Sequence, residues 1–425
     1  MRILISPVGS HGDTLPFVGL GLALQGRGHD VRIYGNGFYA DWFERAGLDF
    51  VETSDAQLAR DALADRRATD SRGGLKMISE GLMATVRPTV DAMARDLGDG
   101  PAWLLGSSLA FAPRLLAEMR QLPFAAVHLS PSMYRSAYLA PRLTPLGHFE
   151  GWPHAVKSGF WALADRLFLD PLFAAPLNRI RAELGLAPVR RLMHDWIHAG
   201  RLNIGMFPAW FAAPQPDWPV GLRLTGFPLH DSDSGAAFSR ELADFLAAGA
   251  SPAVFTAGTA NTSSEDFYAA SAAACERLGI RGVLVASQRG QLPHRLPPGV
   301  IHQAYAPFSQ LFARASVAVH HGGIGTLSQA LRAGVPQLIR PMAYDQFDNS
   351  SRACRLGVAR ELSIAAYGRP GRLDAGLAEL AGNSAVQGAC ARIAARMQHD
   401  DGLGAACNAL EAAFGPDAML SRQAP

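Results

Sequence analysis

The residues best suited to chemistry lie in a glycine-rich turn in the last third of the chain. A β-branched apolar run, Val317 to Val319, predicts a buried strand before the turn, and Gly334 ends the helix predicted after it. A strand, a glycine turn and a helix N-terminus direct free backbone N–H groups and the positive end of the helix dipole at one point. We therefore predict a diphosphate-binding site formed by His320, Gly322, Gly323, Ile324, Gly325 and Thr326.

The same turn nearly matches a dinucleotide-binding fingerprint over residues 323–328, with Ser328 in place of the last glycine. A plain glycine-rich connection between parallel strands is a further alternative. Two features argue against both alternatives. His320 has no use in a dinucleotide fingerprint, and Asp345 and Gln346 follow the next predicted strand, at the sheet edge where ligands bind. A carboxylate beside a carboxamide can read several sugar hydroxyls.

A second candidate for chemistry is the turn after the first predicted strand, Arg2–Pro7. It contains His11 and Asp13, and Pro16 suits the first turn of the following helix. The turn lacks the third glycine of a dinucleotide fingerprint, which argues against NAD. An imidazole has a pKa suited to general-base work, whereas a carboxylate here can accept a proton or simply cap the helix. The residues alone leave these roles open.

Length and composition indicate a two-domain α/β enzyme. The 425 residues exceed one ordinary core, and the formal charge of +2 gives no reason to expect nucleic acid. The four cysteines form no CxxC pair, so free thiols in a cytoplasmic protein are the simplest interpretation. No apolar run reaches the roughly 18 residues of a membrane helix, and Gly9 and Ser10 interrupt the apolar start, which predicts a first strand rather than a signal peptide.

The rest of the chain alternates between strand-like and helix-like patterns. Helical patterns dominate residues 38–97 and 140–200, and proline-rich residues 208–228 are typical of an interdomain linker. Further strands are predicted at residues 31–34, 103–106, 124–129, 253–256, 282–286, 300–303 and 335–339.

Residues 316–349 resemble the donor-binding signature of the family 1 glycosyltransferases, and the similarity extends over nearly the whole chain. The resemblance implies the GT-B fold, in which two Rossmann-like α/β domains face each other across a cleft. It places an acceptor-binding domain at residues 1–213, a linker at 214–232 and a nucleotide-sugar-binding domain at 233–400. A C-terminal helix within 401–425 is expected to pack back on the N-terminal domain.

The resemblance also implies roles for site residues. Asp13 stands where relatives carry the general base, and His11 is expected in the wall of the acceptor site. Where plant relatives place an aspartate after the fourth strand, this chain has Ser107 and Ser108, which are expected to contact the acceptor.

On the donor side, Gly258 and Thr259 are expected to assist the phosphates. Tyr305 is expected to stack on the nucleobase, although a core tyrosine is the alternative, and Asp345 and Gln346 to orient the sugar. No metal and no further cofactor is implied.

Shorter strings, at residues 129–141, 207–219, 225–231 and 304–308, resemble the bacterial rhamnosyltransferases that build mono-rhamnolipids. They imply inverting, metal-independent transfer of L-rhamnose from dTDP-L-rhamnose to a hydroxyl of a hydrophobic acceptor, such as a hydroxyalkanoyloxyalkanoate lipid, with peripheral contact to the inner membrane. Ser328 stands where users of UDP-sugars carry a glutamate that reads both ribose hydroxyls, which favours dTDP.

Other functions stay open at this stage. Within the class, the alternative is a transferase that uses another dTDP- or UDP-hexose on a polyketide, sterol or phenolic aglycone. Outside it, the alternatives are an NAD-dependent oxidoreductase and a non-catalytic binder of nucleotide sugars.

Two other histidine features have simpler interpretations. His194 and His198 have the spacing of metal ligands on one helix face, but the glutamate of a zinc-protease motif is missing, so a solvated surface pair is expected. His321, next to His320, is predicted to be structural.

Overall fold

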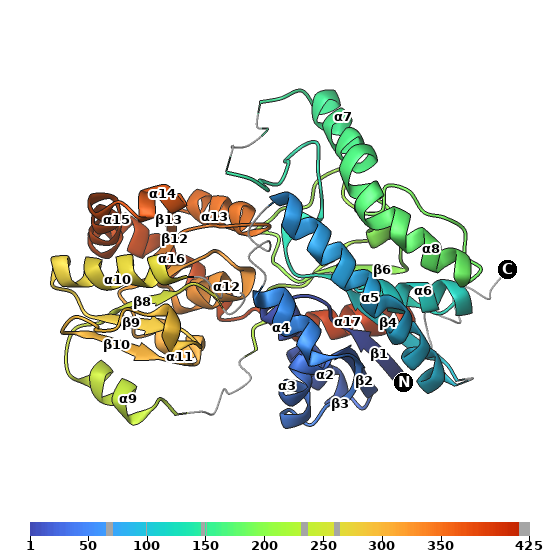
Figure 1. Ribbon diagram of the computed structural model, residues 1–425, viewed down its shortest axis with the longest axis horizontal. Coiled ribbons are helices and arrows are strands. Elements are labelled where there is room, and N and C mark those ends of the chain that lie inside the picture. The colour runs from blue at the N-terminus through green and yellow to red at the C-terminus, as the bar shows by residue number, and fades with distance from the viewer. Residues whose placement is uncertain are drawn as a thin grey trace. The chain divides into compact units, whose positions relative to one another are not determined.

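The computed structural model describes residues 1–64, 71–98, 100–145, 149, 151–230, 237–258 and 264–415. The chain divides into two compact units (Figure 1). The first unit comprises residues 1–141, 148–232 and 401–425, and the second comprises 142–147 and 233–400. Each unit contains a parallel sheet with helices, which confirms the predicted α/β class.

The sheet of the first unit has seven parallel strands in the order β3-β2-β1-β4-β5-β6-β7. In the centre, Ile3 pairs with Val31 on one side and Trp103 on the other. Such central strands are apolar on both faces because helices cover both sides of a parallel sheet. The strands are β1 (Arg2–Ser6), β2 (Asp30–Asn36), β3 (Asp49–Ser54), β4 (Ala102–Ser107), β5 (Phe124–His128), β6 (Leu202–Gly205) and β7 (Arg223–Leu224).

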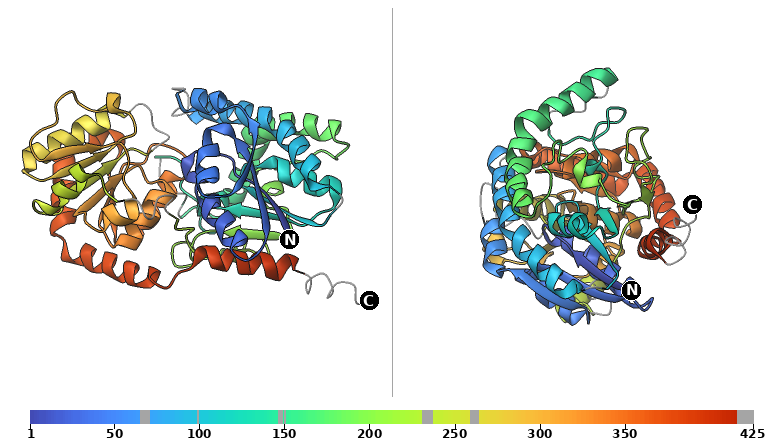
Figure 2. Two further views of the ribbon diagram at one scale, coloured as in Figure 1. Left: turned by 90° about the horizontal axis from the view of Figure 1, so that it is seen from below. Right: turned by 90° about the vertical axis from the view of Figure 1, so that its right-hand side faces the viewer.

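The last helix of this unit, α17, packs against α2 and β6 (Figure 2). A Cβ on Gly402, the first residue of α17, would lie 2.4 Å from the Phe227 carbonyl oxygen, so glycine permits the close approach. The helices of the first unit are α1 (His11–Thr14), α2 (Pro16–Gln25), η1 (Gly37–Tyr39), α3 (Ala40–Arg45), α4 (Ala56–Ala64), α5 (Ser71–Leu97), α6 (Phe111–Arg120), η3 (Pro131–Met133), α7 (His154–Ala164), η4 (Asp165–Ala174), α8 (Ala175–Glu183), η5 (Trp196–His198) and α17 (Gly402–Phe414).

The second unit has six parallel strands in the order β10-β9-β8-β11-β12-β13. They are β8 (Ala253–Thr256), β9 (Gly282–Val285), β10 (Val300–Gln303), β11 (Val317–His320), β12 (Gln337–Ile339) and β13 (Ala359–Glu361). The helices are α9 (Arg240–Ala247), α10 (Glu265–Leu278), η6 (Arg289–Gln291), α11 (Phe308–Phe312), α12 (Ile324–Ala333), α13 (Gln346–Arg355), α14 (Ile364–Tyr367), α15 (Pro370–Gly382) and α16 (Ser384–Met397).

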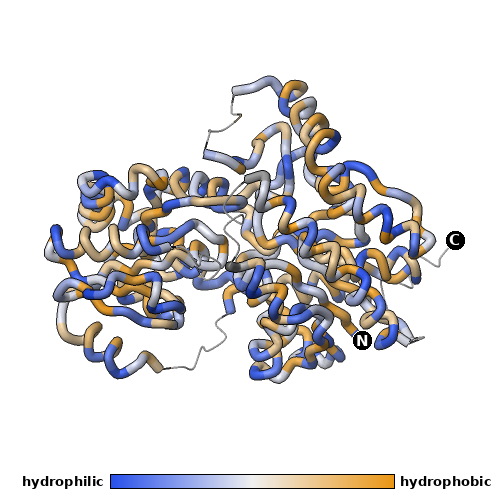
Figure 3. The backbone as a smooth tube through the Cα atoms, in the orientation of Figure 1, coloured by the Kyte–Doolittle hydropathy of each residue, from blue (hydrophilic) through white to orange (hydrophobic). Residues whose placement is uncertain are grey.

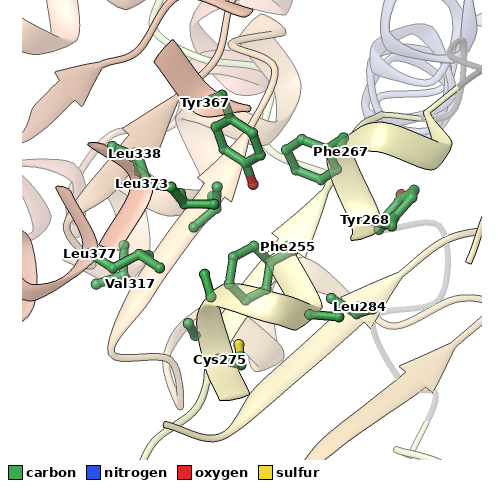
Figure 4. Packing of buried hydrophobic residues seen from close by; sticks show 14 of the residues in the cluster. Phe255, Phe267, Tyr268, Cys275, Leu284, Val317, Leu338, Tyr367, Leu373 and Leu377 are labelled. Carbon is green, nitrogen blue, oxygen red and sulfur yellow. The ribbon is translucent and has the colours of Figure 1, made fainter. Parts of the chain in front are cut away.

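The core of the second unit forms between its sheet and helices α10, α14 and α15 (Figure 4). Phe267 stacks on Tyr367 with ring centroids 5.0 Å apart, and Phe255 lies beneath them in the same cluster. The buried Tyr268 hydroxyl donates to the Val285 carbonyl at 2.7 Å, so its polar atom is satisfied. This packing fixes the positions at which the strands end.

The structure contains four strands that were not predicted, namely β3, β6, β7 and β13. β3 lies within residues 38–97, where helical patterns were expected to dominate, and the strand was not anticipated there. Its sequence, Asp-Phe-Val-Glu-Thr-Ser, occupies a half-exposed edge and lacks the long apolar run of a central strand. β7 lies inside the expected linker, residues 214–232, and pairs with β6, so this part of the linker belongs to the sheet.

A short segment near residue 142 also departs from the expected domain at residues 1–213, because it groups with the second unit. The Arg142 guanidinium donates to Glu361 at 2.7 Å, and its backbone N–H donates to the Asp348 carboxylate at 3.1 Å. No local pattern indicates these contacts, because they join residues far apart in the chain.

Within the described ranges, no helix is long and apolar enough to cross a membrane. Several apolar residues nevertheless lie exposed along α7 and η4, a stretch that carries hydrophobic positions in Figure 3. They are Val156, Phe160, Leu163, Leu167 and Phe168.

Candidate functional site

The predicted diphosphate turn joins β11 to α12 at the C-terminal end of the second sheet. Gly322 has φ +92°, and a Cβ there would lie 2.9 Å from Ile339 and 3.1 Å from the Gln346 carbonyl oxygen. Only glycine fits this conformation and this space. The first backbone bond of the helix runs from the Leu327 N–H to the Gly323 carbonyl at 3.0 Å, so the preceding N–H groups have no partner within the helix. They belong to Ile324, Gly325 and Thr326, none of which is fully buried.

His320 does not occupy the position expected for a phosphate ligand. It is fully buried, its Nδ1 accepts from the Gly322 N–H at 3.0 Å, and its Nε2 lies 2.9 Å from the Gln337 side-chain oxygen. Burial, reinforced by the neighbouring His321, lowers its pKa to about 3, so the ring is neutral near pH 7. The physical reason is that His320 is the last strand residue, paired on both sides in a sheet covered on both faces. His320 supports the turn.

His321, predicted to be structural, is the histidine that faces the turn. Its ring fits between two glycines: a Cβ on Gly258 would lie 2.5 Å from Cε1, and a Cβ on Gly323 would lie 2.5 Å from Nε2. Its Nδ1 is buried and has no hydrogen-bond partner among the described residues. Burial lowers its pKa to about 4, so a neutral imidazole is available to donate to an anion. The sequence feature that could have indicated this role is the position of His321, one residue beyond the end of β11.

Asp345 and Gln346 begin α13, beside the same turn. The Asp345 carboxylate accepts from Asn349 at 2.8 Å, and Asn349 also donates to the Gly322 carbonyl at 3.1 Å. The Gln346 side-chain oxygen accepts from the Met342 N–H at 2.8 Å and from the Ala343 N–H at 3.2 Å. The structure therefore brings both residues to the site, although the Gln346 oxygen already accepts from the local backbone and one Asp345 oxygen from the Asn349 side chain.

Three other residues belong to the expected sugar-donor site, and the structure bears on each differently. Tyr305 is 48% exposed, which contradicts the alternative of a core tyrosine and leaves the stacking role as a prediction. Ser328 is buried, and its hydroxyl donates to the Gly325 carbonyl at 2.9 Å, inside the first turn of α12. Thr259 lies outside the described residues.

On the acceptor side, Asp13 lies in α1, the short helix that follows the turn after β1. Its Oδ2 accepts from the Ser10 N–H at 2.8 Å and from the Ser10 hydroxyl at 2.9 Å. This arrangement requires Gly9, because a Cβ there would lie 2.4 Å from Oδ2. No described residue donates to Oδ1. Asp13 thus caps its helix and keeps one oxygen available.

The pKa of Asp13 is raised by the protein packed around the carboxyl, while the two Ser10 bonds oppose that rise. The residue is nevertheless exposed to solvent, so water screens part of the effect. A carboxylate with an elevated pKa is a better proton acceptor than an ordinary one.

His11 lies in an aromatic cluster two residues away. Its ring packs edge-on against Phe38, Tyr39 and Trp42, with centroids 5.4, 5.2 and 5.9 Å away. Burial lowers its pKa, and its Nδ1 is buried without a hydrogen-bond partner in the described part of the chain. The cluster provides an apolar wall next to Asp13.

The two serines after β4 have different roles. The Ser107 hydroxyl accepts from the Val8 N–H at 2.9 Å and donates to the Val8 carbonyl at 3.2 Å, so it joins the ends of β4 and β1. Ser107 is buried and its hydroxyl already makes two bonds to Val8, and its contact with the acceptor stays a prediction. Ser108 is partly exposed, and its hydroxyl lies 2.9 Å from His128 Nδ1.

His128 continues this contact into the interior, because its Nε2 lies 3.2 Å from His198 Nδ1. Both rings are buried; burial lowers the pKa of His198 to about 3 and that of His128 well below its usual value. The expectation that His198 belongs to a solvated surface pair is therefore wrong. The sequence did not predict this series of contacts, because its members come from three distant segments. They are Ser108, His128 and His198.

The two parallel-sheet units match solved structures over nearly the full length of the chain. The glycotransferase of kitacinnamycin superposes with a TM-score of 0.74 at 22% identity, covering 97% of this chain and 98% of its own. A spinosyn rhamnosyltransferase complexed with thymidine diphosphate gives a TM-score of 0.68 at 19% identity, covering 97% and 100%. The fold is therefore GT-B.

Sequence comparison adds relatives of known activity. Residues 281–402 match the family model described as the erythromycin biosynthesis protein CIII-like C-terminal domain. The O-mycaminosyltylonolide 6-deoxyallosyltransferase of Streptomyces fradiae is 28% identical over 379 residues, which cover 84% of this chain and 85% of that enzyme. The chain also matches the sterol 3-beta-glucosyltransferase of Penicillium rubens but spans 28% of its length. The chain is therefore similar to glycosyltransferases in sequence and in fold, which favours a glycosyltransferase over the oxidoreductase alternative.

Proposed function

We propose that this glycosyltransferase transfers a deoxyhexose, L-rhamnose, from its dTDP derivative to a hydroxyl of a hydrophobic acceptor, with inversion and without a metal ion. The arrangement of Asp13 carries this proposal. One carboxylate oxygen is fixed by two bonds from Ser10, and the other is available at an exposed position beside an aromatic wall.

In this mechanism Asp13 Oδ1 accepts the proton of the acceptor hydroxyl as its oxygen attacks the anomeric carbon. The new carbon–oxygen bond forms on the face opposite the diphosphate, so the configuration inverts. The bond from the anomeric carbon to the diphosphate breaks, and the diphosphate leaves with the electron pair.

The leaving diphosphate would be stabilised by the β11–α12 turn of the second unit. The N–H groups of residues 324–326, the dipole of α12 and the His321 imidazole supply donors for its oxygens. Gly258 leaves room for the imidazole ring. These groups are suited to replace the cation that a metal-dependent transferase would use.

The choice of dTDP rests on Ser328. Its hydroxyl is used by the Gly325 carbonyl, and it is too short to receive both hydroxyls of a ribose. A ribose would therefore bring in a 2′-hydroxyl with little to bond to it at this position, at a cost of about 1–3 kcal/mol. The thymidine diphosphate bound by the spinosyn rhamnosyltransferase is consistent with this choice.

For the acceptor, a hydroxyalkanoyloxyalkanoate lipid is the first candidate, because the apolar wall of Phe38, Tyr39 and Trp42 suits a hydrocarbon chain beside the base. The second candidate is a polyketide or sterol aglycone. It is favoured by the similarity to the tylonolide and sterol transferases.

A lipid acceptor would also explain the exposed apolar stretch on α7 and η4. Val156, Phe160 and Leu163 recur at helical spacing, and Leu167 and Phe168 continue the stretch at 53% and 57% exposure. We expect this face to make peripheral contact with a membrane surface. Co-sedimentation with anionic and neutral lipid vesicles would detect the contact, and Phe160→Ser should reduce it without lowering turnover of a soluble acceptor.

Product analysis by mass spectrometry tests the proposed function. The panel should pair dTDP-L-rhamnose, dTDP-glucose and UDP-glucose with a hydroxyalkanoyloxyalkanoate, a macrolide aglycone and a sterol. The expected product is the rhamnosylated hydroxyalkanoyl lipid. Transfer confined to the macrolide or sterol would establish the second candidate, and transfer from UDP-glucose alone would contradict the proposed donor.

A further inference from the structure

A cavity of about 270 Å³ lies within the first unit, and its lining includes none of the residues assigned to the base or the diphosphate. Its lining includes Tyr134, Arg135, His194, His198 and Trp218. The volume is far larger than one water molecule needs and is close to that of small-molecule sites. Four lining residues, Tyr134, Arg135, His198 and Trp218, are buried and carry polar atoms, whereas empty cavities in proteins are apolar.

The cavity collects buried hydrogen-bond donors that have no partner among the described residues. They are Arg135 Nε and Nη2, the Tyr134 hydroxyl and Trp218 Nε1, from side chains that are 7%, 2% and 7% exposed. Buried donors of this kind are costly unless a ligand or water satisfies them.

The geometry of Arg135 narrows the chemistry of the ligand. Its Nη1 donates to the fully buried Asp165 carboxylate at 2.7 Å, which anchors the guanidinium from one end. Nε and Nη2 form the opposite, side-on edge, and neither atom has a partner among the described residues. Two parallel N–H groups on one edge match the two oxygens of a carboxylate.

Two ion pairs lie beside this edge. Arg135 pairs with Asp165, and Arg191, 3.9 Å from the other Asp165 oxygen, pairs with Asp195 at 3.4 Å, so these four charges cancel. Asp195 and Asp217 also line the cavity, but both residues are exposed, so water screens their charges. The oxygens of Asp217 accept from the Ser136 hydroxyl and the Ala137 N–H, each at 2.7 Å.

We propose that this cavity is a carboxylate-binding site, in which the side-on edge of Arg135 holds both oxygens and Tyr134 and Trp218 donate to the rest of the ligand. The carboxylate could be that of a free small acid or that of the acceptor itself. The second source is structurally reasonable because His198, in the cavity wall, is linked through His128 to Ser108 at the end of β4, the strand beside β1. The site does not depend on the proposed transfer reaction.

Isothermal titration calorimetry of the full chain, without a sugar donor, tests the site. The probes are butyrate, 3-hydroxydecanoate and the methyl ester of 3-hydroxydecanoate. Arg135→Lys keeps a positive charge beside Asp165 but removes the edge, so affinity for both acids should fall about tenfold to a hundredfold. Arg166→Gln, at an exposed arginine of η4, is the matched control and should bind like the unaltered chain.

Tyr134→Phe provides a second variant, because it leaves the Arg135–Asp165 pair intact and removes one donor; it should weaken both acids about threefold to tenfold. Similar affinities for the two acids assign the site to a free small carboxylate, and clear preference for 3-hydroxydecanoate assigns it to the acceptor. Equal binding of acid and methyl ester would overturn the proposal. So would unchanged affinity in both variants, or no binding at millimolar acid, in which case the donors are satisfied by ordered water only.

Discussion

Replacing Asp13 by asparagine separates proton transfer from structure at one position. The asparagine carbonyl oxygen can take the place of Oδ2 and accept both Ser10 bonds, now 2.8 and 2.9 Å long. Its amide nitrogen then replaces Oδ1, the oxygen that no described residue engages, and this nitrogen cannot accept a proton. We expect turnover to fall about 10²–10⁴-fold, which corresponds to about 3–5 kcal/mol in the barrier.

Folding should not suffer from this change. The pKa of the Asp13 carboxyl is raised in the folded state by the surrounding protein, so ionisation costs stability as the pH rises above the pKa of the unfolded chain. Asparagine avoids that cost at neutral pH, and its carbonyl oxygen can still accept the Ser10 bonds at the start of the helix. The melting temperature of Asp13→Asn should therefore equal or slightly exceed that of the unaltered enzyme.

The assay is steady-state release of dTDP with the preferred acceptor, together with calorimetric measurement of donor affinity, which should not change. His11→Ala is the comparison, because His11 is the rival base in the same turn. A mild effect of Asp13→Asn alongside a crippling effect of His11→Ala would refute the assignment of the base.

Four further outcomes are expected. His321→Ala should weaken dTDP binding about tenfold to a hundredfold with little change in melting temperature. His320→Ala leaves a buried N–H and a buried amide oxygen without a partner, so it should mainly lower the melting temperature. The reverse pattern would contradict the roles of the two histidines. Because a general base must be deprotonated, activity should decline below the pKa of Asp13. Ser10→Ala removes a hydrogen bond that lowers this pKa, so it should move the acid limb of the kcat/KM profile to higher pH. An acid limb that stays in place would rule out Asp13 as its source. In competition binding, dTDP should be preferred to UDP by about tenfold or more, and equal affinities would leave the argument from Ser328 without support. Activity should survive EDTA, so loss restored by magnesium or manganese would disprove a metal-free mechanism.

The architecture of the fold and the location of the donor turn were predictable from the amino-acid sequence. Short apolar runs such as Val317–His320 are typical of strands inside a sheet covered on both faces, so they indicated the parallel α/β class. Gly322 was also informative, because a Cβ there would block the approach of the Gln346 backbone, and Gly9 leaves room for the Asp13 side chain in the same way. Short or polar strands such as β3 and β7 were not predictable, because their pairing comes from neighbouring strands rather than from local pattern.

Which polar side chains face the ligand depends instead on the packing of the folded chain. His320 and His321 are adjacent and identical in type, yet strand pairing buries the first and leaves the second at the turn. The same holds for two adjacent serines at the end of β4: the Ser107 hydroxyl bonds to Val8, whereas the Ser108 hydroxyl contacts His128. A side chain at a strand end has no periodic neighbours that reveal its direction, so only the packed sheet can assign it. The orientation of Arg135, with one edge of its guanidinium available, also depends on the packing of the folded chain, because its partner Asp165 comes from a distant helix.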